Sequence, residues 1–249
     1  MLILLPPSET KRAGGVARPL DVTRLALPTL APQREAVVDA LVALSADEEA
    51  AARALKLGPK QHGEIAVNAA LRDAPTMPAV DRYTGVLYDA LGAASLTPAA
   101  RRWVGAHVLV HSAPFGPVGA LDPIPAYRLG AGTSLPGVPA LRRLWSDAVS
   151  SALGELEPRF VLDLRSEAYA ALGPVPDGIP SRYVRVVDEG SDGAVRALNH
   201  FNKHAKGALV RRLADERPRI SSAAGFVRWA DAAGLRVREA AAGELELFA

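Results

Sequence analysis

The chain contains no cysteine among its 249 residues. Disulfide bonds, thiolate metal sites, iron–sulfur clusters and a cysteine nucleophile are therefore all excluded. Aromatic residues make up only 5% of the sequence, which argues against the stacked aromatic platforms that bind single-stranded nucleic acid. The formal net charge is only +2, so any surface for a nucleic acid must come from local clustering of basic residues.

Long apolar runs are also missing. The sequence opens with MLILL, a run of five apolar residues that ends at Pro6 and Pro7. Such a run is too short for a membrane span, and no basic residues precede it as they would in a signal peptide. We therefore expect a cytoplasmic protein without membrane contact, in which residues 2–5 form a buried strand.

The composition is that of a folded protein, because 49% of the residues are hydrophobic and 22% are charged. Apolar periodicity predicts helices and strands that are interspersed without regular βαβ alternation. We therefore predict an α/β (mixed α+β) fold, a single compact domain over residues 1–249 with a mixed central sheet flanked by helices. The predicted helices cover 33–44, 45–55, 63–71, 86–91, 98–106, 140–153, 196–212 and 223–233. The predicted strands cover 2–5, 107–111, 159–164 and 183–188, with a terminal hairpin over 235–239 and 244–248.

Two stretches rich in glycine and proline separate these elements, 11–32 and 112–137. We expect the first to be a long surface loop and the second to be a long loop. Long loops of this kind often carry functional residues, and the second has the composition of a functional loop.

The predicted helix 196–212 has two unlike faces. One face is an apolar stripe typical of core packing. The other face gathers basic residues with no acid among them, although helices usually mix both signs on their exposed face. An anionic partner, phosphate first of all, would explain this bias, and a solvated helix in an arginine-rich protein would explain it equally well. The basic face contains Arg196, His200, Lys203, Gly207 and Arg211, with Lys206 beside it.

Motifs spread along the chain resemble those of the YaaA family of peroxide-stress proteins. The matching segments are Pro6-Pro7-Ser8-Glu9-Thr10-Lys11, Tyr83-Thr84-Gly85, the series Ser112, Gly116, Asp122, Tyr127-Arg128-Leu129 and Gly132, and the series Lys203, Lys206, Gly207 and Arg211. Trp145, Asp147, Asp163, Leu164, Ser166 and Tyr169 match less closely. The order and spacing of these motifs cover nearly the whole chain.

The resemblance implies a compact α/β fold of the family's own type, DNA binding, and a role in limiting damage from hydrogen peroxide and free iron. The chain departs from the family pattern at three places. Phe115 replaces a tyrosine, Asp163 replaces an asparagine, and Ala168 stands where the family has a glutamate. If that glutamate has a chemical task, this chain either lacks that function or uses Glu167 for it.

Two groups of polar residues are candidates for a site. Ser8, Glu9 and Lys11 follow a predicted strand, where α/β proteins place ligands, although Pro-Pro-Ser is also ordinary turn chemistry. Tyr127 and Arg128 offer a hydroxyl and a planar fork for phosphate or carboxylate. Tyr83 completes this second group, and Asp122 is placed either to hold Arg128 or to pin the loop in a purely structural pair.

The segment between the second and third predicted helices resembles a helix-hairpin-helix, over residues 45–72. Such a hairpin presents backbone N–H groups to a DNA phosphate, although two glycines between helices are also common in plain loops. Its basic and glycine positions are Lys56, Gly58, Lys60, His62 and Gly63.

The histidines do not indicate a metal site. His200 and His204 have the i,i+4 spacing of a two-histidine site, but Lys203 between them would repel a cation. We expect His107 and His111, at the ends of an apolar strand, to be packed residues. We therefore expect no metal and no cofactor.

The residues leave open whether the chain is an enzyme. We expect it to bind the phosphate backbone of DNA, as the resemblance implies. The alternatives are an enzyme that binds a small anion such as a nucleotide or nucleobase in a pocket, and a scaffold protein whose matching residues only hold the fold. The oligomeric state is not encoded in these motifs. The DNA-binding candidates are Lys56, Gly58, Lys60, Gly63, Arg196 and Arg211. The pocket candidates are Ser8, Tyr83, Ser112, Arg128, Lys203 and Lys206 for ligand binding, with Glu9, Lys11 and Tyr127 as catalytic candidates.

Overall fold

The computed structural model describes residues 1–16, 18–189, 195–197 and 201–248. Its centre is an eight-stranded sheet, in which seven strands follow the order β4-β3-β1-β6-β7-β10-β9 and β8 pairs with β7. The strands are β1 (Leu2–Leu5), β3 (Val108–Ser112), β4 (Gly116–Gly119), β6 (Val161–Asp163), β7 (Ser181–Glu189), β8 (Val195–Ala197), β9 (Val237–Glu239) and β10 (Glu244–Phe248). A separate two-stranded sheet joins β2 (Met77–Pro78) to β5 (Pro123–Ile124).

Strand β1 lies in the parallel part of the sheet, where Ile3 pairs with Val108 of β3 and with Leu162 of β6. β7 and β10 continue the parallel part, whereas β4, β8 and β9 are antiparallel to their neighbours. All four residues of β1 are buried, as expected for a strand covered on both faces. The chain passes from β1 to β3 on one side and later to β6 on the other. In open α/β sheets, ligands bind outside the carboxyl ends of the strands at such a reversal.

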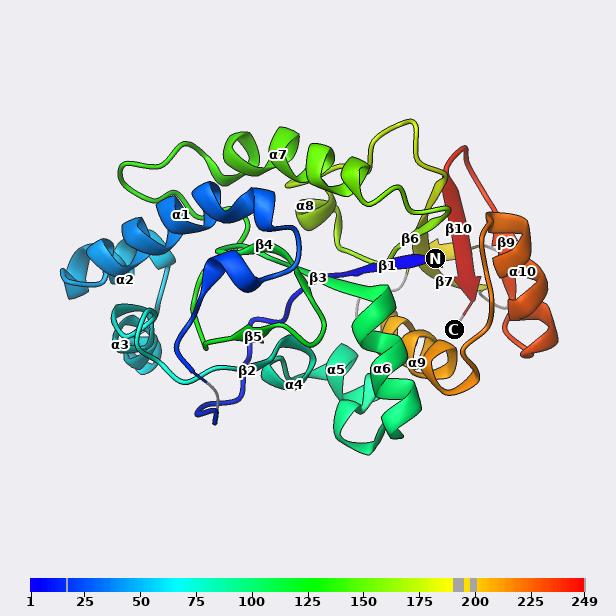
Figure 1. Cartoon of the computed structure of the whole chain (residues 1–249), viewed down its shortest axis with the longest axis horizontal. Helices are drawn as coiled ribbons and strands as arrows, with labels where there is room; N and C mark the ends of the chain where they lie inside the picture. The colour runs from blue at the N-terminus through cyan, green and yellow to red at the C-terminus, as the bar shows by residue number, and fades with distance from the viewer. Residues whose placement is uncertain (17, 190–194, 198–200, 249) are drawn as a thin grey trace.

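Helices cover both sides of the sheet (Figure 1). α1 (Ala31–Leu44), α7 (Leu141–Glu155) and α8 (Glu167–Ala170) lie on one side, and α4 (Ala79–Arg82), α5 (Val86–Leu91), α6 (Pro98–His107) and α9 (Phe201–Glu216) lie on the other. α2 (Glu48–Leu55) and α3 (Gly63–Ala69) lie at one end of the molecule, and α10 (Ala223–Ala232) lies at the other. Short 3-10 turns occur at Val22–Arg24, Pro28–Leu30, Pro59–Gln61 and Ala93–Ser95. The predicted α/β class is thus confirmed.

Helices α5 and α9 approach each other closely at Gly207. A Cβ atom at this position would lie 2.0 Å from the carbonyl oxygen of Leu87. Gly207 is therefore required by packing, and it has no side chain to offer a ligand.

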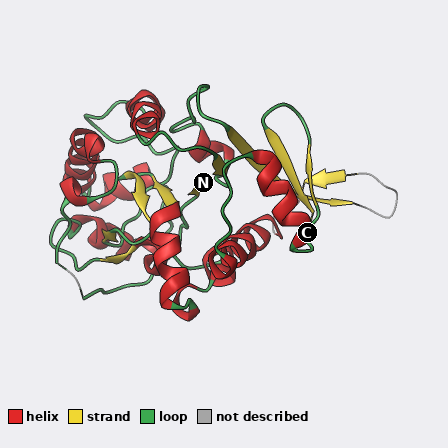
Figure 2. Ribbon diagram, turned by 45° about the vertical axis from the view of Figure 1, so that its right-hand side comes forward, coloured by secondary structure: helices red, strands yellow, loops and turns green. Residues whose placement is uncertain are grey.

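The predicted helix over 196–212 is wrong at its start. Residues 195–197 form β8, which pairs antiparallel with β7 through Val187 and Asp188, and α9 begins at Phe201. Figure 2 shows the paired ends of β7 and β8 extending away from the helices. Gly-Ser-Asp-Gly precedes β8 in the sequence and is turn composition, which favours a hairpin over a continuous helix. Arg196 therefore does not share a helix with Lys203.

The expectation of a long loop over 112–137 is wrong for its first half. Residues 116–119 form β4, which is fully buried and pairs with β3. Gly116 has φ +61°, and its backbone lies against the ring of Trp145, so glycine is needed there for both conformation and space. The predicted terminal hairpin is confirmed, since β9 and β10 are antiparallel neighbours.

None of the helices in the described ranges combines the length and the apolar character needed to cross a membrane.

Candidate functional site

The segment after β1 is attached to the segment after α4 by its backbone. The Arg12 amide donates to the Arg82 carbonyl oxygen at 2.8 Å, and the Thr84 amide donates to the Thr10 carbonyl oxygen at 3.2 Å. An isolated bridge pairs Lys11 with Tyr83. The predicted group that contains Lys11 and the one that contains Tyr83 are therefore adjacent, although they come from distant parts of the sequence.

Lys11 is the centre of this site. Its Nζ donates to the carbonyl oxygens of Ser8 at 3.0 Å and of Glu9 at 3.2 Å. The same atom lies 4.0 Å from the ring centre of Tyr127 and 5.6 Å from that of Tyr83. Burial lowers the pKa of Lys11 to about 7, and Glu64 acts in the opposite direction. Both protonation states of this amine are therefore populated near neutral pH.

The two tyrosines form a buried pair. The hydroxyl oxygens of Tyr83 and Tyr127 lie 2.7 Å apart, and each residue is 2% exposed. Tyr88 packs against Tyr83 and donates its hydroxyl to the Pro6 carbonyl oxygen at 2.7 Å. Burial raises the pKa of each of these three phenols well above its usual range. They stay neutral at physiological pH and offer hydrogen bonds without acting as bases.

Arg128 stands beside Lys11 and lowers its pKa further. Asn68 of α3 clamps the Arg128 backbone, because its side chain accepts from the Arg128 amide at 2.7 Å and donates to the carbonyl oxygen at 2.9 Å. The Arg128 side chain is 19% exposed and lies 3.5 Å from the carboxylate of Glu9, which is 86% exposed. This carboxylate is a loosely held partner that an incoming anion can replace.

The two predicted serines differ in their surroundings. Ser8 is partly buried and lies beside Thr10, with 3.3 Å between their side-chain oxygens. Ser112 is fully buried, accepts from the Phe115 amide at 3.0 Å and donates to the Gly116 carbonyl oxygen at 3.2 Å. Ser112 therefore holds the turn between β3 and β4, next to the tyrosine pair.

The expected pairing of Asp122 with Arg128 is wrong. Asp122 accepts hydrogen bonds from the amides of Ala26 at 2.6 Å and Gly119 at 2.7 Å. The arginine near it is the buried Arg34, not Arg128. Asp122 thus binds backbone amides, because its short side chain reaches only the backbone close to its own turn.

A second cluster follows β6 and contains an ion pair. Arg165 donates to both carboxylate oxygens of Asp163, at 2.9 Å and 2.6 Å, and both residues are buried. Arg165 also lies 2.9 Å from His111 Nδ1, and burial together with this arginine lowers the pKa of His111 well below its usual range. A neutral His111 accepts from Arg165 at Nδ1, so its hydrogen is on Nε2. That buried Nε2 has no hydrogen-bond partner in the described part of the chain.

Lys206 of α9 joins the second cluster, whereas Lys203 does not. Lys206 is 4% exposed, lies 3.4 Å from the Arg165 carbonyl oxygen, and stands 5.5 Å from the Tyr183 ring centre. Burial lowers the pKa of Lys206 to about 8, against the opposing effect of Asp163. Lys203, three positions earlier on the same helix, is exposed.

Tyr169 connects the two clusters. Its ring stands edge-on to His111, with the ring centres 6.1 Å apart. Burial raises the pKa of Tyr169 to about 12, and Glu9 and Arg128 also act on it, in opposite directions. The first cluster thus brings together Ser8, Glu9, Lys11, Tyr83, Ser112, Tyr127 and Arg128, and the second contains Lys206. A cavity of about 190 Å³ adjoins the first cluster and is lined in part by Tyr83 and Thr84.

The residues expected to contact DNA do not form one surface. Lys56, Gly58, Lys60 and Gly63 are exposed around the turn between α2 and α3. α3 and α9 lie toward opposite ends of the molecule (Figure 1). Arg211 of α9 is occupied, because it donates to Asp215 at 2.7 Å and to Ser95 at 2.6 Å. These contacts fix α9 against the end of α5.

The histidines also have separate surroundings. His107 ends α6 and stacks on Trp103, and His111 is fully buried, so both are packed residues. His204 is exposed on α9, and the predicted position His200 lies outside the described residues.

Several residues of the site carry no clear signal in the sequence. Tyr88 lies in an ordinary apolar pattern, and Asn68 sits within a short helix. Tyr169 and Asp163 carry only the weaker of the family-motif matches. Arg165 lies two positions after Asp163, the last residue of β6, and this spacing could have indicated a charged cluster there.

Comparison with known proteins places the chain among bacterial relatives of similar length. A UPF0246 protein of Corynebacterium efficiens is 46% identical over 231 residues, covering 91% of this chain and 90% of the relative. One from Corynebacterium glutamicum is 42% identical over 243 residues, covering 96% and 95%. One from Streptomyces coelicolor is 44% identical over 217 residues, covering 86% and 82%. The family model described as peroxide stress protein YaaA matches residues 1–241. With all its predicted motifs falling inside this match, the chain belongs to the YaaA family of peroxide stress proteins.

Proposed function

We propose that the chain binds a small anion of the nucleotide or nucleobase class at the carboxyl ends of β1, β3 and β6. We further propose that Lys11 exchanges a proton with this ligand. The observation that carries the proposal is the Lys11 amine, which lies on the ring of Tyr127 next to the guanidinium of Arg128. An amine with a lowered pKa beside a fixed cation is typical of catalytic and binding sites.

Arg128 would hold the anion. Its planar fork suits phosphate or carboxylate, and its backbone is fixed from both sides by Asn68. Glu9 occupies the fork only through an exposed carboxylate at 3.5 Å, so a ligand anion can take its place. Glu9 then turns to solvent, which makes it a poorer candidate for the proton acceptor than Lys11.

Lys11 would carry the proton. With a pKa of about 7 it attracts an anion as an ammonium and accepts a proton as an amine, both at neutral pH. The neutral hydroxyls of Tyr83 and Tyr127 would orient polar groups of the ligand. Buried Lys206 would add positive charge from the second cluster without direct exposure to solvent.

Isothermal titration with AMP at pH 7 tests this proposal. Arg128→Gln should weaken AMP binding about tenfold or more, since a charge-assisted pair is lost. Arg142→Gln, an exposed position on α7, is the matched control and should leave binding unchanged. Binding that Arg128→Gln leaves intact would overturn the assignment.

Proton exchange can be measured in the same experiment by using buffers of different ionisation enthalpy. An anion beside Lys11 raises its pKa, so binding should take up about 0.5 proton per AMP at pH 7 relative to Lys11→Met. The AMP phosphate titrates in the same way with both chains, so subtracting the proton uptake of Lys11→Met from that of the unmodified chain removes its contribution. Equal proton uptake by both chains would exclude Lys11 as the titrating group.

DNA binding is a second candidate, because Lys56 and Lys60 are exposed and their side chains make neither an ion pair nor a hydrogen bond among the described residues. They flank a turn that follows α2 and precedes α3, as in a helix-hairpin-helix. Lys56→Ala/Lys60→Ala should weaken binding of a duplex and reduce its salt dependence, measured by fluorescence anisotropy. Lys203→Ala, exposed on α9, tests whether the other end of the molecule contributes. Unchanged binding in both variants would remove the DNA proposal.

A further inference from the structure

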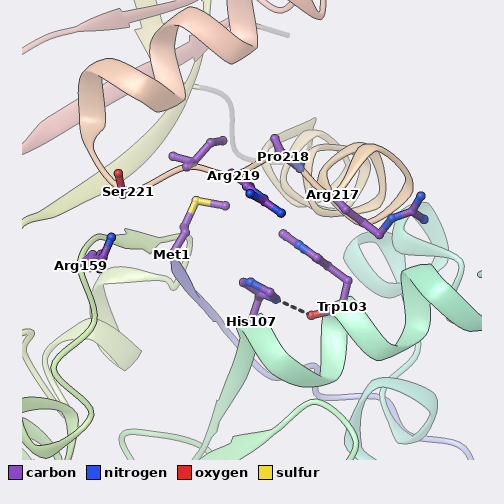
Figure 3. Close-up of a pocket in the computed structure, with 9 residues that line it drawn as sticks. Met1, Trp103, His107, Arg159, Arg217, Pro218, Arg219 and Ser221 are labelled. Carbon is purple, nitrogen blue, oxygen red and sulfur yellow. Dashed lines mark hydrogen bonds between the residues drawn. The ribbon is translucent and has the colours of Figure 1, made fainter.

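A larger cavity lies at the opposite edge of the sheet, where the parallel strands begin (Figure 3). Its volume is about 490 Å³. Met1 precedes β1, Trp103 and His107 stand on the last turns of α6 before β3, and Arg159 precedes β6. Residues 217–221, between α9 and α10, complete the lining. None of these residues belongs to the Lys11 site, which is at the carboxyl ends of the same strands.

The cavity concentrates positive charge. Its lining includes Arg159, Arg217 and Arg219 and contains no acidic residue. Within the described part of the chain, none of these three side chains makes an ion pair or a hydrogen bond. By contrast, the neighbouring Arg211 and Arg212 of α9 are each paired with an acid one turn later. Unpaired like charges around one cavity repel each other, and a bound anion removes this repulsion.

The backbone at Arg217 shapes one wall of the cavity. Arg217 has φ +50°, and its amide donates to the Leu213 carbonyl oxygen at 2.8 Å, which ends α9. Glycine is the favoured residue in this left-handed position. An arginine is present there despite the conformational cost, and the turn it makes brings Pro218 to Ser221 over the cavity.

The remaining wall is formed by two stacked aromatic rings, and a hydrogen bond fixes the orientation of one of them. The rings of Trp103 and His107 stack with centres 4.4 Å apart and an angle of 12°. His107 Nδ1 donates to the Trp103 carbonyl oxygen at 2.8 Å, which leaves Nε2 as the nitrogen for a ligand. In Figure 3, Arg159 lies on one side of the cavity and Arg219 on the other, with Met1 between them and His107 below in this view. The Arg217 guanidinium points away from Met1 and His107.

We propose that this cavity binds a chain of two or more phosphates, either inorganic or as the tail of a nucleotide. Separate cations on two sides of a cavity match an extended polyanion better than a single phosphate, which one arginine fork can hold. Arg159 and Arg219 would each hold one phosphate group. The stacked His107 and Trp103 would provide a flat wall for a base, if the ligand carries one.

Isothermal titration of the full chain with inorganic pyrophosphate, ADP and orthophosphate tests this proposal. Pyrophosphate should bind at least about tenfold more tightly than orthophosphate, because it reaches both arginines. Arg159→Gln/Arg219→Gln should weaken pyrophosphate binding about 100-fold, given about tenfold for each lost charge-assisted contact. ADP binding more tightly than pyrophosphate identifies a nucleotide tail, and equal or weaker ADP binding identifies an inorganic chain.

Two controls separate this cavity from the Lys11 site and from general charge effects. Arg142→Gln/Arg143→Gln removes two exposed arginines of α7, the same number of charges, and should leave pyrophosphate binding unchanged. The titrations are repeated in an Arg128→Gln background, which removes anion binding at the Lys11 site, so the pyrophosphate binding that remains there belongs to this cavity. The proposal is overturned if pyrophosphate does not bind, if it binds no better than orthophosphate, or if the Arg159→Gln/Arg219→Gln chain binds it normally while its circular dichroism spectrum is native.

Discussion

Replacing Lys11 with methionine should stabilise the protein at neutral pH while it impairs the site. Methionine fills a similar volume without charge, so the cost of burying an ammonium disappears. A pKa lowered from 10.5 to about 7 corresponds to roughly 4 kcal/mol at pH 7, at 1.36 kcal/mol for each pKa unit. The variant also loses two hydrogen bonds and the contact with Tyr127, together worth about 3 kcal/mol. We expect a net gain of about 1 kcal/mol in the free energy of unfolding.

The pH dependence of this gain is the sharper test. Between pH 7 and 10.5 the unfolded chain holds a proton on Lys11 that the folded chain has released, so the unmodified protein gains stability as pH rises. Lys11→Met lacks this pH-dependent contribution. The free energy of unfolding of the variant, relative to that of the unmodified protein, should therefore fall by about 2 kcal/mol between pH 7 and pH 9, so that the variant becomes the less stable of the two.

Urea denaturation of both chains at pH 7, 8 and 9 measures the difference directly. All other titrating groups are common to the two chains, so their contributions cancel. A stability difference that stays constant across these pH values would mean that Lys11 titrates near 10.5. The proposed role of Lys11 would then lose its basis.

Three further substitutions test the packing around α9 and the second cluster. Gly207→Ala should destabilise the protein by at least about 2 kcal/mol, because its Cβ would meet the Leu87 carbonyl oxygen, and thermal unfolding will show this as a lower Tm. Arg165→Met leaves Asp163 buried without its partner and should cost about 3–5 kcal/mol in urea unfolding, whereas a loss below about 1 kcal/mol would argue against a buried ion pair. Lys206→Met should gain stability at pH 7 and lose about 1 kcal/mol of that gain by pH 9, since burial lowers the pKa of Lys206 to about 8; a pH-independent gain would contradict this.

The sequence predicts the strands and the polar groups of the site better than it predicts how they combine. The apolar run of β1 and the Pro-Pro break after it follow from local chemistry. Lys11 and Tyr127 are each recognisable as candidates. Their contact depends on the backbone bridge between Lys11 and Tyr83, a long-range pairing that no local pattern encodes.

Helix α9 shows why a helical face was not enough to predict exposure. The periodicity places Lys206 beside a basic, solvated face. The helix packs against both α5 and β7, so a wider part of its surface is covered than one apolar stripe suggests. Lys206 is buried as a result, whereas Lys203 three positions earlier is exposed.

The predictions for the start of α9 and for the β4 segment were wrong for a related reason. Val195 and its neighbours gain more from pairing with β7 than from extending a helix, and tertiary context overrides helix propensity in such cases. Residues 116–119 have the composition of a loop, but they form a buried strand. Gly116 lets the backbone of this strand pack closely against the Trp145 ring. Glycine in a sequence marks close packing as often as it marks an open loop.

The most direct test of the proposed site is the titration of Lys11 itself, with and without an anion. The chain has only five lysines, so their side-chain carbon signals can be resolved by NMR, and Lys11→Met identifies the signal of Lys11. We expect a pKa of about 7 in the free protein, rising when AMP is added and not rising in Arg128→Gln. A value near 10.5 that AMP does not change would show that this lysine is an ordinary solvated residue and that no anion binds beside it.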